Sequence, residues 1–568
     1  MRASRFRVFA VLSVVLLGVL AYAGTFANDW VWDDASSVLV HEHVQDPAKL
    51  LQLFREDQHA FGRGAGNFYR PLVSVSFMVD YWLSHDAALD PSPREIKPAL
   101  FHAGNLAWHL AAALLLLAVL LRLKTPRFVA LAVPAIFVVH PLHTEAVAYI
   151  SGRADMMSAA FMFAGLWLAL GTPKGRAHPV ALVFSALCVT CALLSKESSF
   201  IFPALLAVLL LLRSSEGERP AVPQRLIPLA APLVLVAGYG VLRATVLKFA
   251  ENATVPSSLG QRLLETGQAF TFYLEKLFWP TNLHMEQSLA GYASWRAYLG
   301  WALILLVIFV IVASIHFRQR RIAMGLLWFV VAWLPISGIF PLNAPMAEHW
   351  MYVPMAGFWW ALAEAVVLLG DGPAAQRSRV ALAYGLCALL LVMTVARNRD
   401  WHDNETLFRA TLADNPASER VRFNLAVSYQ DISKNDAGAR REYEALLQQY
   451  AERREASSVS GRDYLLPDED EVLLSLGRVL VRQGDYNAAL PHLGRLISLT
   501  PPSVIEGPGG KAARATVTMA AVEAGRCFLA LGDLGQAGAA FERAVQLDPS
   551  LAGYLQQLMA GSASLREG

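Results

Sequence analysis

Two adjacent carboxylates are the first residues in this sequence that could do chemistry. Asp33 and Asp34 stand in "FANDWVWDDASSVLVHEHV" (26–44), directly after a long apolar run. Neighbouring carboxylates repel, so at least one needs a proton, a cation or a strong hydrogen-bond donor. Asp34 could be the N-cap of a helix that begins at "ASSVL". Alternatively, one acid is a general base on an acceptor hydroxyl while the other orients it or holds a metal.

Four cations could stabilise negative charge near this pair. They are Arg70 in "NFYRPL", Arg153 in "SGRAD", Lys196 in "LLSKESSF" and His349 in "MAEHWMYVP". Each adjoins an apolar segment, where a charged side chain is energetically costly and therefore indicates a functional role. Together the four side chains could bind a phosphate leaving group. The long side chains could instead snorkel to the membrane interface. Arg153 could equally form a salt bridge with Asp155.

The stretch "HPLHTE" offers a second polar cluster. His140, His143 and Glu145 have a spacing compatible with a metal such as zinc or manganese, but the two histidines flank Pro141 and need not share a face. The other interpretation, which we favour, is a polar brace for the first-loop acids. If Mg²⁺ or Mn²⁺ is bound, the expected ligands are Asp33, Asp34 and Glu145. The sequence does not decide whether an ion is required.

The elements that position these residues are predicted to be membrane helices. The chain has 568 residues, 55% hydrophobic and only 17% charged, with a mean hydropathy of +0.39. Such a composition is typical of a polytopic helical bundle. The N-terminal apolar run could be a signal peptide, but its length favours a retained first span. About eleven spans are expected, near 8–26, 101–121, 128–150, 155–171, 179–195, 200–213, 226–246, 298–316, 322–340, 353–370 and 380–396.

The basic loops predict the orientation of this bundle. If the spans alternate, six basic segments fall on one side: "MRASRFR", "RLKTPR", "TPKGRAH" (172–178), "RSSEGERP" (213–220), "HFRQRR" and "AAQRSR". The positive-inside rule makes that side cytoplasmic. The N-terminus is then cytoplasmic, and the loop 27–100 and everything after 397 are external. The candidate residues gather on the external face, whereas a transporter would place polar groups near the bilayer midplane.

The C-terminal part is predicted to be an α-solenoid. Beyond residue 397 the sequence becomes polar, with a 34-residue period typical of tetratricopeptide (TPR) repeats, near 419–452, 470–503 and 518–551. The fold class is therefore all-α, with a membrane domain over 1–397 and a TPR domain over 398–568. The repeats could bind an extended polypeptide on a concave surface, or could be a passive cap or dimerisation element.

The ordered motifs resemble a known family. "WVWDDASSVLVHEHV", "NFYRPLVSVSFMVDYWL", "VHPLHTEAVAYISGRADMMSAAF", "LLSKESSF", "LFWPTNLHMEQS" and "MAEHWMYVP" occur in the order found in the transmembrane and tetratricopeptide-repeat O-mannosyltransferases and their bacterial relatives. These are GT-C class, polyprenyl-phosphate-sugar-dependent glycosyltransferases. The resemblance implies inverting sugar transfer to an external hydroxyl, with Asp33 or Asp34 as general base; we favour Asp33. The family's "ER-LY-P" pattern falls on Glu348, His349 and Tyr352, with His349 where Arg is usual.

Three functions remain open at this stage. The first is a bacterial inner-membrane glycosyltransferase, with mannose a candidate sugar, whose TPR domain binds a protein or peptide acceptor. The second is a non-enzymatic scaffold that recruits envelope proteins. The third is a GT-C enzyme with a lipid or glycan acceptor. A net charge of +2 gives no indication of a nucleic-acid partner.

Overall fold

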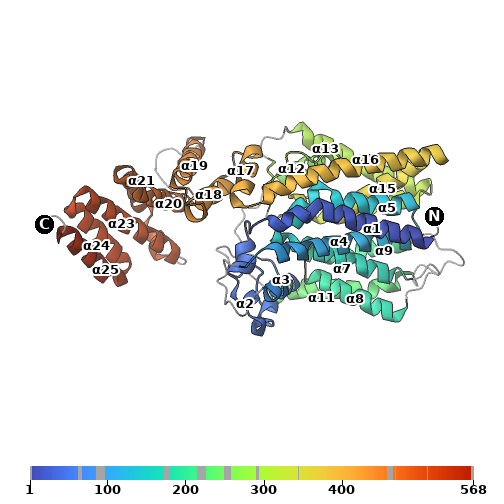
Figure 1. Cartoon of the computed structure of the whole chain (residues 1–568), viewed down its shortest axis with the longest axis horizontal. Helices are drawn as coiled ribbons and strands as arrows, with labels where there is room; N and C mark the ends of the chain where they lie inside the picture. The colour runs from blue at the N-terminus through green and yellow to red at the C-terminus, as the bar shows by residue number, and fades with distance from the viewer. Residues whose placement is uncertain are drawn as a thin grey trace. The chain divides into compact units, whose positions relative to one another are not determined.

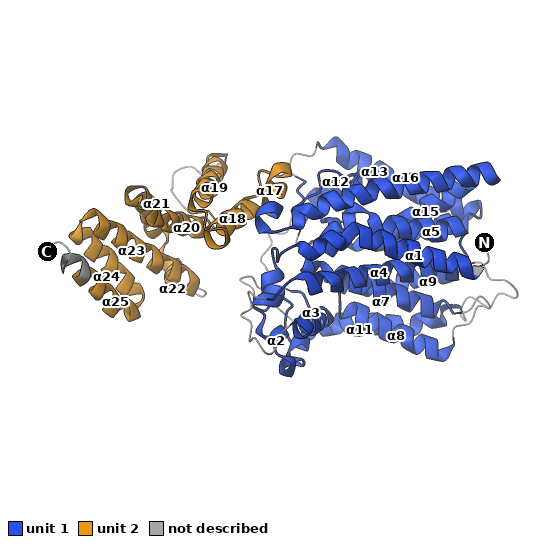
Figure 2. Cartoon of the chain, in the orientation of Figure 1, with its two compact units in different colours: residues 1–407 blue, residues 408–568 orange. Residues whose placement is uncertain are grey.

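The computed structural model describes residues 3–564 except 62–66, 85–95, 172–177, 214–224, 248–257, 290–292, 343, 457–464, 467 and 508–509. These residues form helices and connecting segments, and no strand occurs among them. The chain divides into two compact units, residues 1–407 and 408–568 (Figures 1 and 2). Most of two expected cytoplasmic loops, 172–178 and 213–220, lies outside the described residues.

Five described helices are long and apolar enough to cross a membrane. They contain α1 (Ala3–Tyr22), α4 (Ala99–Arg122), α11 (Ala230–Thr245), α13 (Trp295–His316) and α16 (Pro373–Asn398), and for α1, α11 and α16 the adjoining 3-10 turn is included. On α13, Leu305, Phe309 and Val312 are each at least 60% exposed. Large apolar side chains exposed in a row are unfavourable in water and favourable in lipid. This face of α13 is therefore suited to contact with lipid.

One expected span, 128–150, is broken. α5 (Arg127–Val139) ends before Pro141, and after a short 3-10 turn the chain continues as α6 (Thr144–Ala148), bent by 54°. His140, which precedes Pro141, has an extended backbone (φ −79°, ψ 128°), the conformation that a residue before proline favours, and this ends α5. The break brings residues 140–153 across the end of the bundle, where most of the candidate residues lie.

The remaining expected spans are shorter helices. They are α7 (Arg153–Ala169), α8 (Pro179–Leu193), α9 (Phe202–Leu212), α14 (Arg320–Trp333) and α15 (Pro354–Leu368). With the bent pair counted once, up to six segments of the described chain meet the length and apolarity expected of a span, so the count of eleven remains a prediction. α12 (Leu259–Phe278) was not expected as a helix, because it alternates apolar and charged residues, and it packs on α13.

The loop between α1 and α4 forms a small cap of its own. It contains short 3-10 and π turns, α2 (Glu42–Gln45) and α3 (Pro71–Ser84). Apolar residues of this cap, among them Val38, Leu53 and Phe77, form a core with Phe101 of α4 and Ile150. The first-loop acids are therefore held against a packed surface.

The second unit consists of helical hairpins. The pairs α18 (Glu419–Val427) with α19 (Asp436–Ala456), α20 (Glu469–Arg482) with α21 (Tyr486–Leu499), and α23 (Lys511–Leu531) with α24 (Leu534–Leu547) lie over the three 34-residue units. Smaller elements are α17 (Asn404–Asp414), which crosses the unit boundary, α22 (Pro502–Glu506) and α25 (Ala552–Ser564). Gly525 lets α23 approach Phe541 of α24 closely, since a Cβ there would collide with the phenyl ring.

Candidate functional site

The two adjacent acids occupy opposite environments. Asp34 is fully buried, and its Oδ1 accepts hydrogen bonds from the backbone N–H and the hydroxyl of Ser151, both at 2.8 Å. Its Oδ2 accepts from the Val31 N–H at 3.1 Å. Asp34 makes no side-chain cap bond to the helix that follows, so the N-cap interpretation is wrong. It instead ties the first loop to the segment after the broken span. Asp33, by contrast, is exposed.

Burial dominates the electrostatics of this pair. It raises the pKa of Asp34 to about 7, although the Val31 and Ser151 donors oppose the rise. The charge of Asp33 raises the pKa of Asp34 further. Burial also raises the pKa of Tyr149, with smaller contributions from both acids, which places its phenol within their electrostatic reach. The Tyr149 ring stacks on Trp401, with centroids 5.6 Å apart and planes at 28°.

Arg153 does not occupy a position in which it could reach a ligand. Its guanidinium is 1% exposed and forms a 2.5 Å ion pair with Asp80. It also donates to the Asn105 side chain at 2.7 Å and to the Phe101 carbonyl at 2.8 Å. The salt bridge anticipated from sequence exists, but its partner is Asp80 instead of Asp155. Arg153 therefore joins α3, α4 and α7, and its guanidinium is not presented to a phosphate.

Arg70 and Lys196 form a cluster with two acids. Lys196 pairs with Asp155 at 2.6 Å, while Arg70 makes two bonds to Glu197, from Nη2 at 2.7 Å and from Nε at 3.1 Å. Because Lys196 and Glu197 are consecutive, the two ion pairs lie next to each other. The Glu197 carboxylate is 41% exposed, so this cluster reaches the surface. Sequence reasoning did not identify Glu197 as a site residue, although it directly follows Lys196 in the sequence.

A third cluster surrounds the 348–352 segment. His349 Nδ1 lies 2.9 Å from Oε1 of Glu145, and the His349 backbone N–H donates to Oε2 at 3.0 Å. Glu348 is fully buried and accepts from Gln287 at 3.2 Å and from Arg397 at 3.4 Å. Sequence reasoning did not identify Gln287 or Arg397 as partners of Glu348, because they lie 61 and 49 residues away from it. Gln287 does belong to the motif "LFWPTNLHMEQS", but the motif gave no role for it.

The histidines of "HPLHTE" have structural contacts. His140 Nδ1 accepts from the Leu142 N–H at 3.2 Å, and its Nε2 lies 3.1 Å from the Leu277 carbonyl of α12. His143 Nδ1 lies 2.9 Å from the Phe137 carbonyl, and its ring packs on Tyr352 at 4.3 Å. Tyr352 in turn lies 2.6 Å from His109. These contacts brace α5 and α6 against their neighbours, whereas the brace expected from sequence was for the first-loop acids.

Most of the carboxylate oxygens that could bind a metal ion already contact other groups of the protein. Both oxygens of Asp34 and both of Glu145 accept protein hydrogen bonds. Among the described residues, no group of three or more His, Cys, Asp and Glu side chains converges as a metal site would. The three expected ligands, Asp33, Asp34 and Glu145, are thus not gathered around one point as a divalent ion would require.

The arrangement offers one exposed acid beside a buried electrostatic network. Asp33 interacts with Tyr149, whose stacking partner Trp401 lies 5.8 Å from the guanidinium of Arg397. Arg397 in turn contacts Glu348. Chemically, an exposed carboxylate can accept a proton, and cations nearby can stabilise an oxyanion.

Comparisons with known proteins agree with the motifs. A tetratricopeptide repeat family model matches residues 520–551. A protein O-mannosyl-transferase of Caenorhabditis elegans, F38B6.6, is 25% identical over 73% of this chain and 59% of its own length. Human protein O-mannosyl-transferase TMTC4 is 24% identical over 76% of this chain and 65% of its own. No solved structure matches. The predicted resemblance is confirmed, and the chain spans less than two thirds of these relatives.

Proposed function

We propose that this chain is a membrane glycosyltransferase that moves a sugar, mannose by analogy with its relatives' names, from a polyprenyl-phosphate carrier to a hydroxyl of a protein or peptide. The observation that carries the proposal is the contrast between exposed Asp33 and buried, threefold hydrogen-bonded Asp34 at the end of an apolar bundle. A pure membrane anchor has no need to hold one acid rigidly so that its neighbour is presented to solvent.

In the proposed reaction Asp33 is the general base. The acceptor oxygen attacks C1 of the sugar and gives its proton to Asp33, while the bond from C1 to the phosphate oxygen breaks. The lipid phosphate leaves with the electron pair, and a single displacement inverts the configuration at C1. A phosphate is already a good leaving group, so cations are needed more than a general acid.

The remaining candidates divide by exposure. Arg70 is the first proposed phosphate-binding cation, because its partner Glu197 is 41% exposed. Lys196 is the second, although it is only 8% exposed in its pair with Asp155, because it directly precedes Glu197. His349 is 27% exposed and is a third candidate. Arg153 is withdrawn from this role, because Asp80 and the helices around it enclose its guanidinium. No step is assigned to a divalent ion, since Asp33, Asp34 and Glu145 do not converge on one point in the described part of the chain.

The proposed setting is the external face of a bacterial inner membrane. The support for this orientation is the distribution of basic loops, which makes the N-terminus cytoplasmic and places residues after 397 outside. The TPR repeats support a polypeptide acceptor, since stacked helical hairpins present an extended binding surface.

The experiment that tests the proposal is sugar transfer by the full chain reconstituted in lipid. A panel of polyprenyl-phosphate sugars is supplied with and without EDTA, and Asp33→Asn is compared with Asp29→Asn, an exposed acid of the same loop. Loss of a general base lowers the rate about 10²- to 10⁴-fold, so Asp33→Asn should show that loss while Asp29→Asn retains activity. If no donor reacts, the scaffold alternative replaces the enzyme. If both variants transfer sugar equally well, Asp33 is not the general base.

A further inference from the structure

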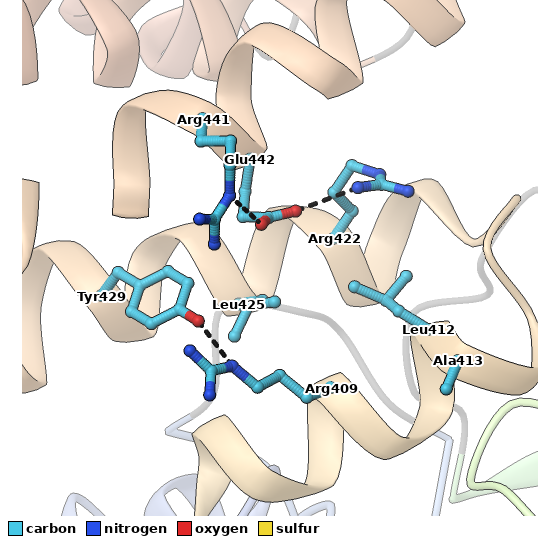
Figure 3. A pocket seen from close by; sticks show the side chains of 8 residues that line it. All are labelled: Arg409, Leu412, Ala413, Arg422, Leu425, Tyr429, Arg441 and Glu442. Atoms are coloured by element: carbon cyan, nitrogen blue, oxygen red, sulfur yellow. Dashed lines mark hydrogen bonds and ion pairs between the residues drawn. The ribbon is translucent and has the colours of Figure 1, made fainter. Parts of the chain in front are cut away.

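A pocket in the second unit lies among the first helices after the membrane domain. It has a volume of about 410 Å³ and is formed by α17, α18, the π turn that follows α18 (Ser428–Ile432) and α19 (Figure 3). Its lining residues are Arg409, Leu412, Ala413, Arg422, Leu425, Tyr429, Arg441 and Glu442. A cavity of this size holds one or two side chains of a partner instead of a folded surface.

The polar lining is rich in arginine. Arg409 donates from Nε to the Tyr429 hydroxyl at 2.7 Å, and its guanidinium lies 5.5 Å from the centre of that ring. Tyr429 is 1% exposed, so it fixes the stem of Arg409 while the arginine itself remains exposed. An arginine held in this way loses little conformational entropy when it binds an anion.

One carboxylate is shared by the other two arginines. Glu442 accepts from Arg422 at 2.9 Å through Oε2 and from Arg441 at 3.1 Å through Oε1 (Figure 3). Arg441 is 67% exposed. Three guanidinium groups against one carboxylate give the lining a formal charge of +2, so the pocket favours an anion. Leu412, Ala413 and Leu425 form an apolar wall beside these groups.

We propose that this pocket binds an acidic side chain of a polypeptide, with an apolar neighbour against the leucine wall. Guanidinium forks match carboxylates in shape and charge. The apolar wall and the repeat architecture favour a peptide over a bare phosphate. That the occupant belongs to the acceptor rests on the proposed function, but the binding itself does not.

The test is fluorescence anisotropy of labelled peptides with the full chain in lipid nanodiscs. Short peptides containing Leu-Glu are compared with otherwise identical peptides containing Leu-Gln. The acidic peptide should bind about tenfold more tightly or better, the equivalent of one charge-assisted hydrogen bond. Arg409→Gln and Arg441→Gln should each weaken it toward the Leu-Gln level. Arg441→Glu, at an exposed position, brings the formal charge of the lining to zero and should abolish the preference for the acidic peptide.

A matched control is available at the far end of the same unit. Arg526 donates to the Tyr554 hydroxyl at 2.6 Å, an arginine–tyrosine pair outside the pocket, so Arg526→Gln should leave binding unchanged. Equal loss in Arg526→Gln, no preference for Glu over Gln, or equal competition by inorganic phosphate or anionic vesicles would overturn the proposal. Pocket-dependent binding without sugar transfer would overturn only the proposed function, and transfer without such binding would overturn only the pocket.

Discussion

At the scale of single residues, Trp32 explains how two adjacent acids come to differ. Its φ of +52° lies in the left-handed region, which a bulky side chain rarely adopts. The Trp32 N–H donates to Asn404 Oδ1 at 2.8 Å, which helps to hold this conformation. The turn sends Asp34 inward to Ser151 and leaves Asp33 facing out. Such strained positions persist where the surrounding structure over-determines them, often at functional sites.

The raised pKa of Asp34 predicts a pH dependence of stability. The folded state holds a proton on Asp34 up to about pH 7, whereas the unfolded carboxyl releases it near its ordinary value of 3.8. The free energy of unfolding should therefore fall as pH rises through this window. Asp34→Asn cannot titrate, so its thermal midpoint, measured in detergent across the window, should lose this part of the slope.

The neighbouring acid provides the comparison for that measurement. Asp33→Asn should keep most of the slope of the unmodified chain, because burial is the main cause of the raised pKa of Asp34 and the charge of Asp33 is a minor one. At low pH Asp34→Asn should also be less stable, by about 1–3 kcal/mol, since its amide cannot accept all three hydrogen bonds. This difference should shrink as pH rises, because only the unmodified chain loses stability through the window. Identical slopes in the two variants would show that Asp34 is ionised in the folded protein.

Residue chemistry alone identified the Asp33–Asp34 pair but not the partners that define it. Ser151 is 117 residues from Asp34 and has no sequence signal for this role. The same limit applies to Arg153. A charged residue in an apolar stretch predicted a functional role for this side chain, but its ion-pair partner, Asp80, comes from another helix. A charge in an apolar segment predicts that some partner exists, and only the fold decides whether that partner is protein or ligand.

At the scale of helices, glycine sets how closely membrane helices approach. α14 and α15 meet at Gly325 and Gly357, where a Cβ on Gly325 would lie 2.6 Å from the Ala361 nitrogen and 2.8 Å from the Gly357 carbonyl oxygen. Small residues allow such backbone contact, which is a main source of helix association in lipid. His349 and Tyr352 precede α15 directly, so this contact also positions the third polar cluster.

Gly325→Ala should therefore destabilise the bundle. The added methyl group meets backbone atoms that cannot rotate away, at a cost of about 1–3 kcal/mol. Gly238 of α11 is the matched control, because no atom lies within 4 Å of a Cβ there and alanine is the better helix former. Thermal unfolding in detergent should place Gly325→Ala below, and Gly238→Ala level with or above, the unmodified chain. A reversed order would mean that α14 and α15 are not held at this distance.

Periodicity and hydropathy predicted some of the helices and failed to predict others. Long apolar runs correspond to α1, α4, α13 and α16, because length and composition suffice there. Hydropathy did not predict the break at Pro141, because it averages over a window that is longer than a turn. It also did not predict α12, because an average does not distinguish the apolar face of a helix from its polar face. The repeat helices of the second unit lie over the expected period because each buries its small residues locally, as Gly525 does against Phe541.

At the scale of the whole molecule, the distribution of basic loops predicts opposite sides for the N-terminus and the repeats. Alkaline phosphatase fused after the last residue should be active in a bacterial host, because the enzyme folds only outside the cytoplasm. A fusion ending at Arg318, in the turn between α13 and α14, should be inactive. The opposite pattern would place Asp33 in the cytoplasm and remove the proposed external acceptor.

The contact between Trp32 and Asn404 joins residues 372 positions apart. At about 5–20 residues per second, the ribosome needs roughly 20 to 75 s to make the chain between them. During that time the loop that carries Asp33 has left the ribosome without the amide oxygen that its strained turn requires. The turn that presents Asp33, the proposed base, can therefore form its bond to Asn404 only after the whole bundle has been synthesised. We expect the protein to become active only once this residue has left the ribosome.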